Sequence, residues 1–159
     1  MQLADPSREG FYRKSGKRML DICIVLLLLP IVLPVMVMLM ILVARDGHSP
    51  LYRQERVGRG GRVFMFWKLR TMVPDAKAHL DRYLSTNDEA RREWEEYQKL
   101  SCDPRITPIG DFLRKSSLDE LPQLWNVLKG DMSLVGPRPM MPEQRPLYPG
   151  HAYYQLLPG

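Results

Sequence analysis

Two adjacent acidic residues, Asp119 and Glu120, stand in front of a short apolar helix pattern. Side chains of neighbouring residues do not face each other on a helix, so the two carboxylates point in different directions. One carboxylate can bind Mg²⁺ while the other attacks a phosphorus atom, and the metal neutralises part of the charge of a diphosphate. Carboxylate attack forms an acyl-phosphate and divides one displacement into two easier steps. This interpretation predicts phosphoryl chemistry at Asp119 and Glu120.

The same block also matches the start of a helix that has no catalytic role. Ser117 with Glu120 three residues later has the spacing of a capping box. Alternatively, Asp119 is itself the N-cap, which places Pro122 in the first turn, where its missing N–H costs nothing. A helix N-terminus attracts phosphate by the same free N–H groups and dipole that favour the acids. The block taken alone leaves capping and catalysis open.

Three basic residues have side chains suited to binding phosphate. Arg138 lies between Pro137 and Pro139, whose rings restrict the backbone and hold it away from helix. A guanidinium presented rigidly can grip a phosphate with two parallel hydrogen bonds. Lys68 and Arg70 fall on one face of a predicted strand, where they can clamp a polyphosphate. The alternatives without a ligand are an irregular turn at Arg138 and a solvated edge strand.

The elements that must position these residues predict a small α+β domain. Residues 51–57 and 62–72 have the pattern of two strands, joined by a tight turn at residues 58–61. Residues 75–100 have an amphipathic pattern that predicts one helix, and residues 109–114 predict a short helix. The domain is therefore mainly helical and contains a β-hairpin.

An apolar run without charged side chains covers residues 22–44, and crossing a bilayer core takes about 20 residues. Pro30 and Pro34 lie near its middle, where each removes a backbone donor and predicts a bend or a break. Basic residues flank the run on both sides, and Lys and Arg mark the cytoplasmic side of a membrane segment. A re-entrant helix that dips into one leaflet satisfies both observations, and an ordinary transmembrane helix is the alternative.

The predicted organisation has three parts: an N-terminal tail at residues 1–16, a re-entrant membrane-anchoring helix at 17–45 and a cytoplasmic domain at 46–159. The formal charge of +5 is compatible with nucleic acid, anionic lipid or a phosphate-bearing substrate. Few aromatic residues interleave the basic ones and no recognition module is present, so nucleic acid is not expected as a partner. Cys23 and Cys102 lack metal-ligand spacing, which fits a reducing compartment.

Five motifs occur in an order that resembles the bacterial sugar transferase family, the monotopic phosphoglycosyl transferases. The resemblance covers residues 17–159, nearly the whole chain. The motifs are KRMLD at 17–21, KLRTM at 68–72, DPRIT at 103–107, LDELPQLWNVL at 118–128 and GDMSLVGPRP at 130–139.

The resemblance implies roles for the site residues. The family has a re-entrant membrane helix broken at a proline, which Pro34 matches, and a catalytic Asp-Glu pair. Asp119 is accordingly implied as the nucleophile and Glu120 as its metal-site or positioning partner, with Mg²⁺ as the cofactor at this pair. Arg138 is implied as a phosphate contact. The remaining basic motif places Lys68 and Arg70 near a diphosphate.

The implied reaction transfers a hexose-1-phosphate from a UDP-sugar to polyprenyl (undecaprenyl) phosphate. The aspartate attacks the UDP-sugar, UMP leaves, and polyprenyl phosphate takes the sugar-phosphate from the enzyme. Such a reaction starts the synthesis of an exopolysaccharide or O-antigen repeat at the cytoplasmic face of the bacterial inner membrane. The expected partners are a UDP-sugar, polyprenyl phosphate and membrane lipid, whereas the sequence fixes neither the sugar nor the oligomeric state.

The chain departs from the family pattern at two places. Leu33 stands where members often have Ser before the helix-breaking proline. Members usually continue from a Pro-Gly such as Pro158-Gly159 into an Ile-Thr-Gly run and a further segment, so we expect a C-terminal truncation. The alternative function is a non-catalytic remnant, or a regulatory membrane protein, of the same fold.

Overall fold

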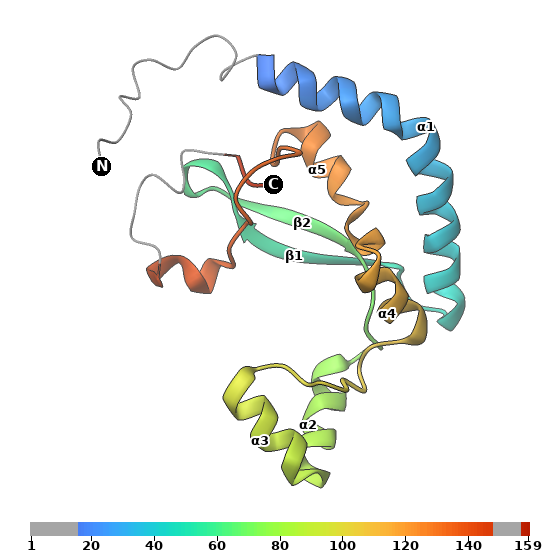
Figure 1. The fold of residues 1–159 in the computed structure, drawn as a ribbon, viewed down its shortest axis with the longest axis vertical. Coiled ribbons are helices and arrows are strands. Elements are labelled where there is room, and N and C mark those ends of the chain that lie inside the picture. The colour runs from blue at the N-terminus through green and yellow to red at the C-terminus, as the bar shows by residue number, and fades with distance from the viewer. Residues whose placement is uncertain (1–15, 148–156) are drawn as a thin grey trace. The chain divides into compact units, whose positions relative to one another are not determined.

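The structure, a computed structural model, describes residues 16–147 and 157–159 (Figure 1). Its helices and its two-stranded sheet confirm the predicted α+β class. The predicted N-terminal tail lies outside the described residues, apart from Gly16. The chain folds as two compact units. The first comprises Met1–Met36, Arg53–Trp67 and Pro122–Gly159, and the second comprises Val37–Tyr52 and Lys68–Leu121.

The apolar segment forms one long helix, α1, at Lys17–Val43. This helix continues through Pro30 and Pro34, so the predicted break at these prolines is not found in the described residues. Figure 1 shows α1 as one uninterrupted, curved ribbon. Curvature is the usual way in which a helix accommodates a proline, because it moves the ring away from the preceding turn.

Among the described residues, one helix is long and apolar enough to cross a membrane, the stretch Lys17–Asp46 that contains α1. Only 11% of its most apolar window is buried inside the structure, whereas the core helix of a globular domain is mostly covered. Leu27 and Ile31, for example, are 77% and 68% exposed. A continuous apolar surface of this size needs an apolar partner.

The predicted hairpin is present as β1 at Leu51–Val57 and β2 at Val63–Leu69. A 3-10 turn at Arg59–Gly61 joins the strands, and Gly60 and Gly61 take the positive φ angles (68° and 75°) that such a tight turn requires. The second strand is shorter than the predicted 62–72. It ends at Leu69 because the chain leaves β1 there and forms a separate antiparallel bridge near residue 106.

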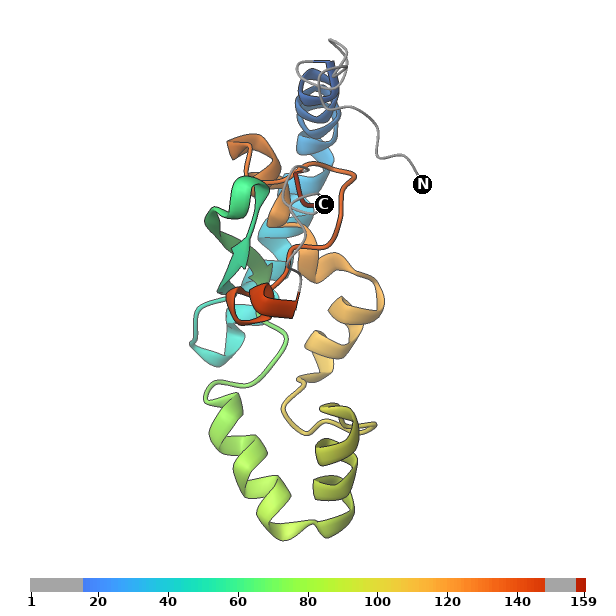
Figure 2. The ribbon, with the colours of Figure 1, turned by 90° about the vertical axis from the view of Figure 1, so that its left-hand side faces the viewer.

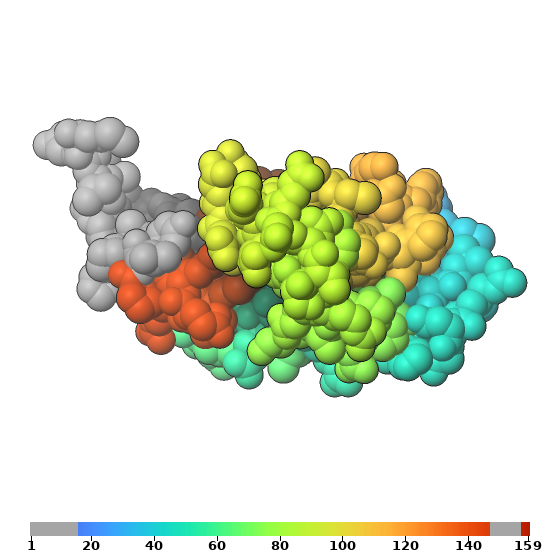
Figure 3. All heavy atoms as spheres, turned by 90° about the horizontal axis from the view of Figure 1, so that it is seen from below, coloured from blue at the N-terminus to red at the C-terminus, as the bar shows by residue number. Residues whose placement is uncertain are grey.

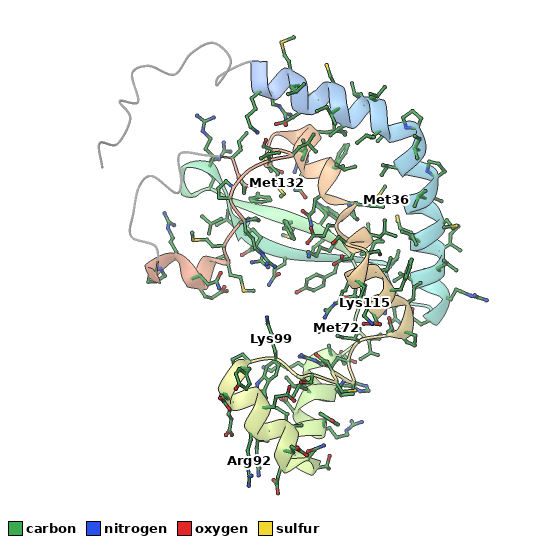
Figure 4. The ribbon with its side chains drawn as sticks, viewed as in Figure 1. Met36, Met72, Arg92, Lys99, Lys115 and Met132 are labelled. Atoms are coloured by element: carbon green, nitrogen blue, oxygen red, sulfur yellow. The ribbon has the colours of Figure 1, made fainter. Side chains whose placement is uncertain are left out.

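The core of the first unit lies between α1, the hairpin and a short helix, α5, at Gln123–Lys129. Its buried members are Val25, Phe66, Val127 and Met132, the last of which is labelled in Figure 4. Each comes from a different part of the chain, so their contact fixes α1, β2 and α5 to one another.

Asn126 attaches α5 to the free edge of β2 and is fully buried. Its side-chain amide donates to the Met65 carbonyl oxygen at 2.8 Å and accepts from the Trp67 N–H at 3.3 Å. One side chain thus satisfies a donor and an acceptor that a neighbouring strand would otherwise satisfy. Asn126 therefore takes the place of a third strand at this position.

The second unit contains a pair of helices, α2 at Ala76–Thr86 and α3 at Asp88–Tyr97. The prediction of a single helix over residues 75–100 is wrong, because the chain becomes extended at Asn87. The Asn87 side chain accepts from the Ala90 N–H and caps α3. The two helices lie side by side in Figure 2, and Figure 3 shows their outer surface as one continuous yellow-green patch.

The predicted short helix is confirmed as α4 at Pro108–Lys115, and it packs closely on the chain just beyond β2. Its N-cap is Thr107, whose hydroxyl accepts from the Gly110 N–H at 3.0 Å. A Cβ atom on Gly110 would lie 2.0 Å from the Thr71 carbonyl oxygen, so only glycine fits there. Arg114 reinforces the contact by donating from Nε to Thr71 Oγ1 at 2.8 Å.

Replacement of Asn126 by alanine should lower the free energy of unfolding by about 2–4 kcal/mol, because it leaves two partly buried backbone groups, the Met65 carbonyl and the Trp67 N–H, without their partner. Thermal or urea unfolding of the purified protein in detergent measures the change. The matched control is Lys129→Ala on the same helix, which removes one exposed ion pair and should cost at most about 0.5 kcal/mol. Equal effects of both variants would contradict the role of Asn126.

Substitution of Gly110 by alanine should displace α4 from Thr71, because the added methyl group meets backbone that cannot rotate away. We expect a destabilisation of about 1–3 kcal/mol, the usual range for overpacking. The neighbouring Asp111→Ala exchange loses only a surface pair and should leave the melting temperature nearly unchanged. A Gly110→Ala protein that melts with the wild type would exclude this close packing.

Candidate active site

The acidic pair lies in a 3-10 turn, Leu118–Glu120, between α4 and α5. Both predicted forms of capping are wrong. Ser117 has a left-handed backbone (φ 58°) and its side chain makes no capping hydrogen bond. Asp119 lies inside the 3-10 turn, and Pro122 occupies the N-cap position of α5. Capping therefore does not explain why two acids stand here.

The two carboxylates differ in their exposure to solvent. Asp119 is buried, with 10% of its side chain exposed, whereas 49% of the Glu120 side chain is exposed. Lys68 brings one ammonium group to both of them. Its Nζ atom lies 2.7 Å from Glu120 Oε1 and 3.5 Å from Asp119 Oδ2. Three of the predicted site residues are therefore together in the second unit.

The donor set at this place suits magnesium. Mg²⁺ binds oxygen ligands and is usually held by one or two carboxylates together with substrate phosphates and water. Asp119 and Glu120 supply two such carboxylates. No group of three or more Asp, Glu, His or Cys residues that could hold a metal is found in the described part of the chain. Asp119 and Glu120 are thus the residues that could hold such an ion.

Arg70 lies two residues beyond Lys68, but the structure gives it other partners. Its Nη1 and Nη2 atoms donate to the two Asp46 carboxylate oxygens, both at 2.7 Å. Nε donates to the Ser49 carbonyl at 2.8 Å, Nη2 also to Val43 O at 3.1 Å, and Nη1 to Met72 O at 3.3 Å. All five N–H groups of the guanidinium are engaged in these bonds. A diphosphate contact would require Arg70 to release some of them.

The hydrogen bonds from Arg70 lower the pKa of Asp46 from its ordinary value of 3.8 to about 2. Asp46 is therefore ionised at neutral pH and remains so well into the acidic range. The Arg70 side chain is only 13% exposed, and its fork faces the carboxylate in the bidentate manner typical of strong Arg–carboxylate pairs.

Arg138, in the first unit, is held by the backbone on either side of it. The Pro137 carbonyl accepts from the Gly159 N–H at 3.0 Å, and the Pro139 carbonyl accepts from Arg56 Nη1 at 3.3 Å. Met140, which follows Pro139, pairs with β1: its carbonyl accepts from the Val57 N–H at 2.9 Å. These anchors agree with the rigid presentation that the two prolines predict, and the Arg138 residue itself is exposed.

The KRMLD motif also receives a structural explanation in the first unit. The buried Asp21 carboxylate accepts from Ser133 Oγ at 2.7 Å and pairs with Lys17. Lys17 also donates to Ser133 Oγ and to the Val135 carbonyl. Arg18 donates to the last carbonyls of α5. The start of α1 is thus tied to the loop that leads to Arg138.

Sequence reasoning missed four residues that position this machinery: Asp46, Thr71, Gly110 and Asn126. Asn126 carried a usable signal, because a polar residue inside an otherwise apolar helix pattern is usually buried with a specific partner. Thr71 lies in the KLRTM motif next to Arg70 and three residues after Lys68. Asp46 precedes Gly47, a pair typical of a turn, and nothing local in the sequence indicates its pairing with Arg70.

Comparison with known proteins identifies relatives. The model of the family described as bacterial sugar transferase matches residues 12–159. A UDP-galactose-lipid carrier transferase of Erwinia amylovora is 50% identical over 145 residues, which cover 90% of this chain and 30% of that protein. An undecaprenyl-phosphate galactose phosphotransferase of Salmonella typhimurium is 48% identical over 141 residues, or 89% of this chain and 30% of that protein.

A shorter relative is matched over most of its own length. The exopolysaccharide production protein ExoY of Sinorhizobium fredii is 40% identical over 155 residues, which cover 95% of this chain and 69% of that protein. The chain thus spans about 30% of the longer relatives and about two thirds of the shorter one. Because the family model covers nearly the whole chain and all five motifs lie inside the match, this protein belongs to the bacterial sugar transferase family.

Proposed function

We propose that the protein transfers a hexose-1-phosphate from a UDP-sugar to polyprenyl (undecaprenyl) phosphate and releases UMP. The observation that carries this proposal is the buried Asp119 carboxylate, held beside Glu120 and Lys68. The names of the relatives support the substrate classes, since they include a UDP-galactose-lipid carrier transferase and an undecaprenyl-phosphate galactose phosphotransferase. The ExoY relatives, named as exopolysaccharide production proteins, support a role in exopolysaccharide synthesis.

The reaction runs in two displacements at one phosphorus atom. An Asp119 carboxylate oxygen attacks the phosphorus that bears the sugar, and the bond from that phosphorus to UMP breaks. A phosphate oxygen of polyprenyl phosphate then attacks the same phosphorus, and the Asp119 carboxylate leaves. The products are UMP and a polyprenyl diphosphate sugar, and the enzyme regains its free carboxylate.

Burial suits Asp119 to the role of nucleophile. A side chain that is 10% exposed has a fixed orientation, and its surroundings limit the access of water to an acyl-phosphate. Glu120 is half exposed and can turn toward an incoming substrate. Magnesium bound at the pair would neutralise diphosphate charge. Lys68, which already faces both carboxylates, can hold the negative charge of the substrate close to them.

The membrane proposal depends on α1. Its exposed apolar surface fits insertion into lipid, and the basic residues on both sides of it favour two cytoplasmic ends. We therefore place the protein at the inner membrane of a bacterium as a re-entrant, monotopic anchor, with its catalytic residues at the cytoplasmic face. In this arrangement the polyprenyl chain remains in lipid while its phosphate reaches the site.

Asp119→Asn should abolish the covalent intermediate. The protein is incubated with Mg²⁺ and a panel of nucleotide sugars, without polyprenyl phosphate, and intact-protein and peptide mass spectrometry follow. We expect a sugar-phosphate adduct on Asp119 in the wild type and none in the variant. The control is Asp111→Asn, an exposed aspartate on α4, which should form the adduct normally. An adduct on another residue, or equal labelling of the Asp119→Asn protein, would refute the mechanism.

Cysteine labelling tests the re-entrant topology. Single cysteines at positions 8 and 53, in a background with Cys23→Ala and Cys102→Ala, are exposed to a membrane-impermeant maleimide in intact and in inverted vesicles. Both positions should be labelled only in inverted vesicles, because both flanks of α1 are basic. A separate variant with only Cys23→Ala, which retains Cys102 as its single cysteine, is the control for labelling of the cytoplasmic domain. Labels on opposite faces would instead indicate a transmembrane helix.

A further inference from the structure

We infer that the ion pair of Arg70 with Asp46 acts as a joint: it fixes the position of the end of α1 relative to the catalytic carboxylates of Asp119 and Glu120. Arg70 is then a positioning residue rather than a contact to the diphosphate. The inference rests on the proposed function, because it assigns a role within the same site. All of the residues that carry it belong to the second unit.

The joint closes the turn that follows the membrane helix. The last carbonyl groups of an α-helix have no hydrogen-bond donor within that helix. Arg70 provides a donor for one of these carbonyls, because its Nη2 atom donates to Val43 O. The chain then forms a 3-10 turn that ends at Asp46 and passes through Gly47 in a left-handed conformation (φ 80°). It returns to β1 past Ser49, whose carbonyl also accepts from Arg70. The turn is thus wrapped around a single guanidinium.

The same strand end carries the cation of the acidic pair. Arg70 directly follows the last residue of β2, and its backbone N–H donates to the Pro50 carbonyl at 2.8 Å, so Lys68 and Arg70 belong to one hydrogen-bonded stretch of backbone. Lys68 contacts Asp119 and Glu120 directly. Thr71, one residue further, holds α4, which leads into the 3-10 turn of the acidic pair. A shift of this strand end would displace both supports of the nucleophile at once.

Charge balance also favours the joint over a substrate contact. The Asp46 carboxylate neutralises the guanidinium through two hydrogen bonds of 2.7 Å. Freeing Arg70 for a phosphate would leave Asp46 without its cation and would undo the hydrogen bond to Val43.

The two roles predict different mutant kinetics, measured as sugar-phosphate transfer to polyprenyl phosphate in detergent or nanodiscs. If the pair is a joint, Asp46→Asn and Arg70→Met should each lower kcat by about 10- to 100-fold, the cost of a misplacement of roughly 1 Å. The KM for the UDP-sugar should stay within about twofold, because no substrate contact is lost. The double variant should be no worse than the more severe single variant. Arg70→Lys, which keeps the charge without the fork, should recover only part of the rate.

The matched control is the surface pair of Arg91 with Asp88 on α3 in the same unit, where Arg91→Met and Asp88→Asn should leave kcat and KM unchanged. An Asp46→Asn protein with wild-type kinetics, combined with an Arg70→Met protein whose KM rises about tenfold or more, would overturn the joint and make Arg70 a substrate contact.

Hydrogen–deuterium exchange supplies a readout that does not need turnover. Both joint variants should exchange faster at residues 43–50 and also at residues 116–121, while the Arg91 control matches the wild type. Unchanged exchange at residues 116–121 would refute the coupling even if the rate falls. Absence of an adduct on wild-type Asp119 would instead count against the proposed function, and the exchange result would stand separately.

Discussion

A carboxylate withdrawn from water needs a cation or hydrogen-bond donors beside it. Asp119 is such a carboxylate, and Lys68 is the cation that it faces. Lys68 can stay in place only if the end of β2 does not move. The hydrogen bonds of Arg70 to the turn after α1 hold this strand end from one side, and the contacts of Thr71 with α4 hold it from the other. The second unit is thus organised around the needs of one buried negative charge.

Local sequence patterns predicted the elements that are specified by residues close together in the chain. Alternating side chains with a glycine-rich turn predicted the hairpin, and residues 109–114 predicted the short helix α4. The spacing of the acidic pair alone left capping and catalysis open, and its catalytic role was implied only by the family resemblance. The family resemblance implied that Lys68 lies near a diphosphate, and the structure places its ammonium group 3.5 Å from Asp119 Oδ2 and 2.7 Å from Glu120 Oε1.

Features that depend on distant partners could not be predicted in this way. The helix break at Asn87 follows from a side-chain cap that competes with an otherwise continuous amphipathic pattern. Arg70 looks like a phosphate ligand in the sequence, because nothing near it in the chain reveals Asp46 twenty-four residues earlier as its partner. The two prolines predicted a break or a bend, and the helix is continuous but curved.

The segment that contains α2 and α3 begins and ends at adjacent stretches of backbone, residues 71–73 and 105–107, which form a narrow neck. Met72 pairs with Ile106 there, Val73 N–H donates to the residue-105 carbonyl at 2.8 Å, and Thr107 N–H donates to Thr71 O at 3.1 Å. Figure 4 labels Met72 at this neck. Because the neck is closed by its own hydrogen bonds, the thirty or so residues beyond it can change in length or sequence without reaching the carboxylates. The segment that contains α2 and α3 can therefore acquire a different surface during evolution while the positions of Asp119 and Glu120 are preserved.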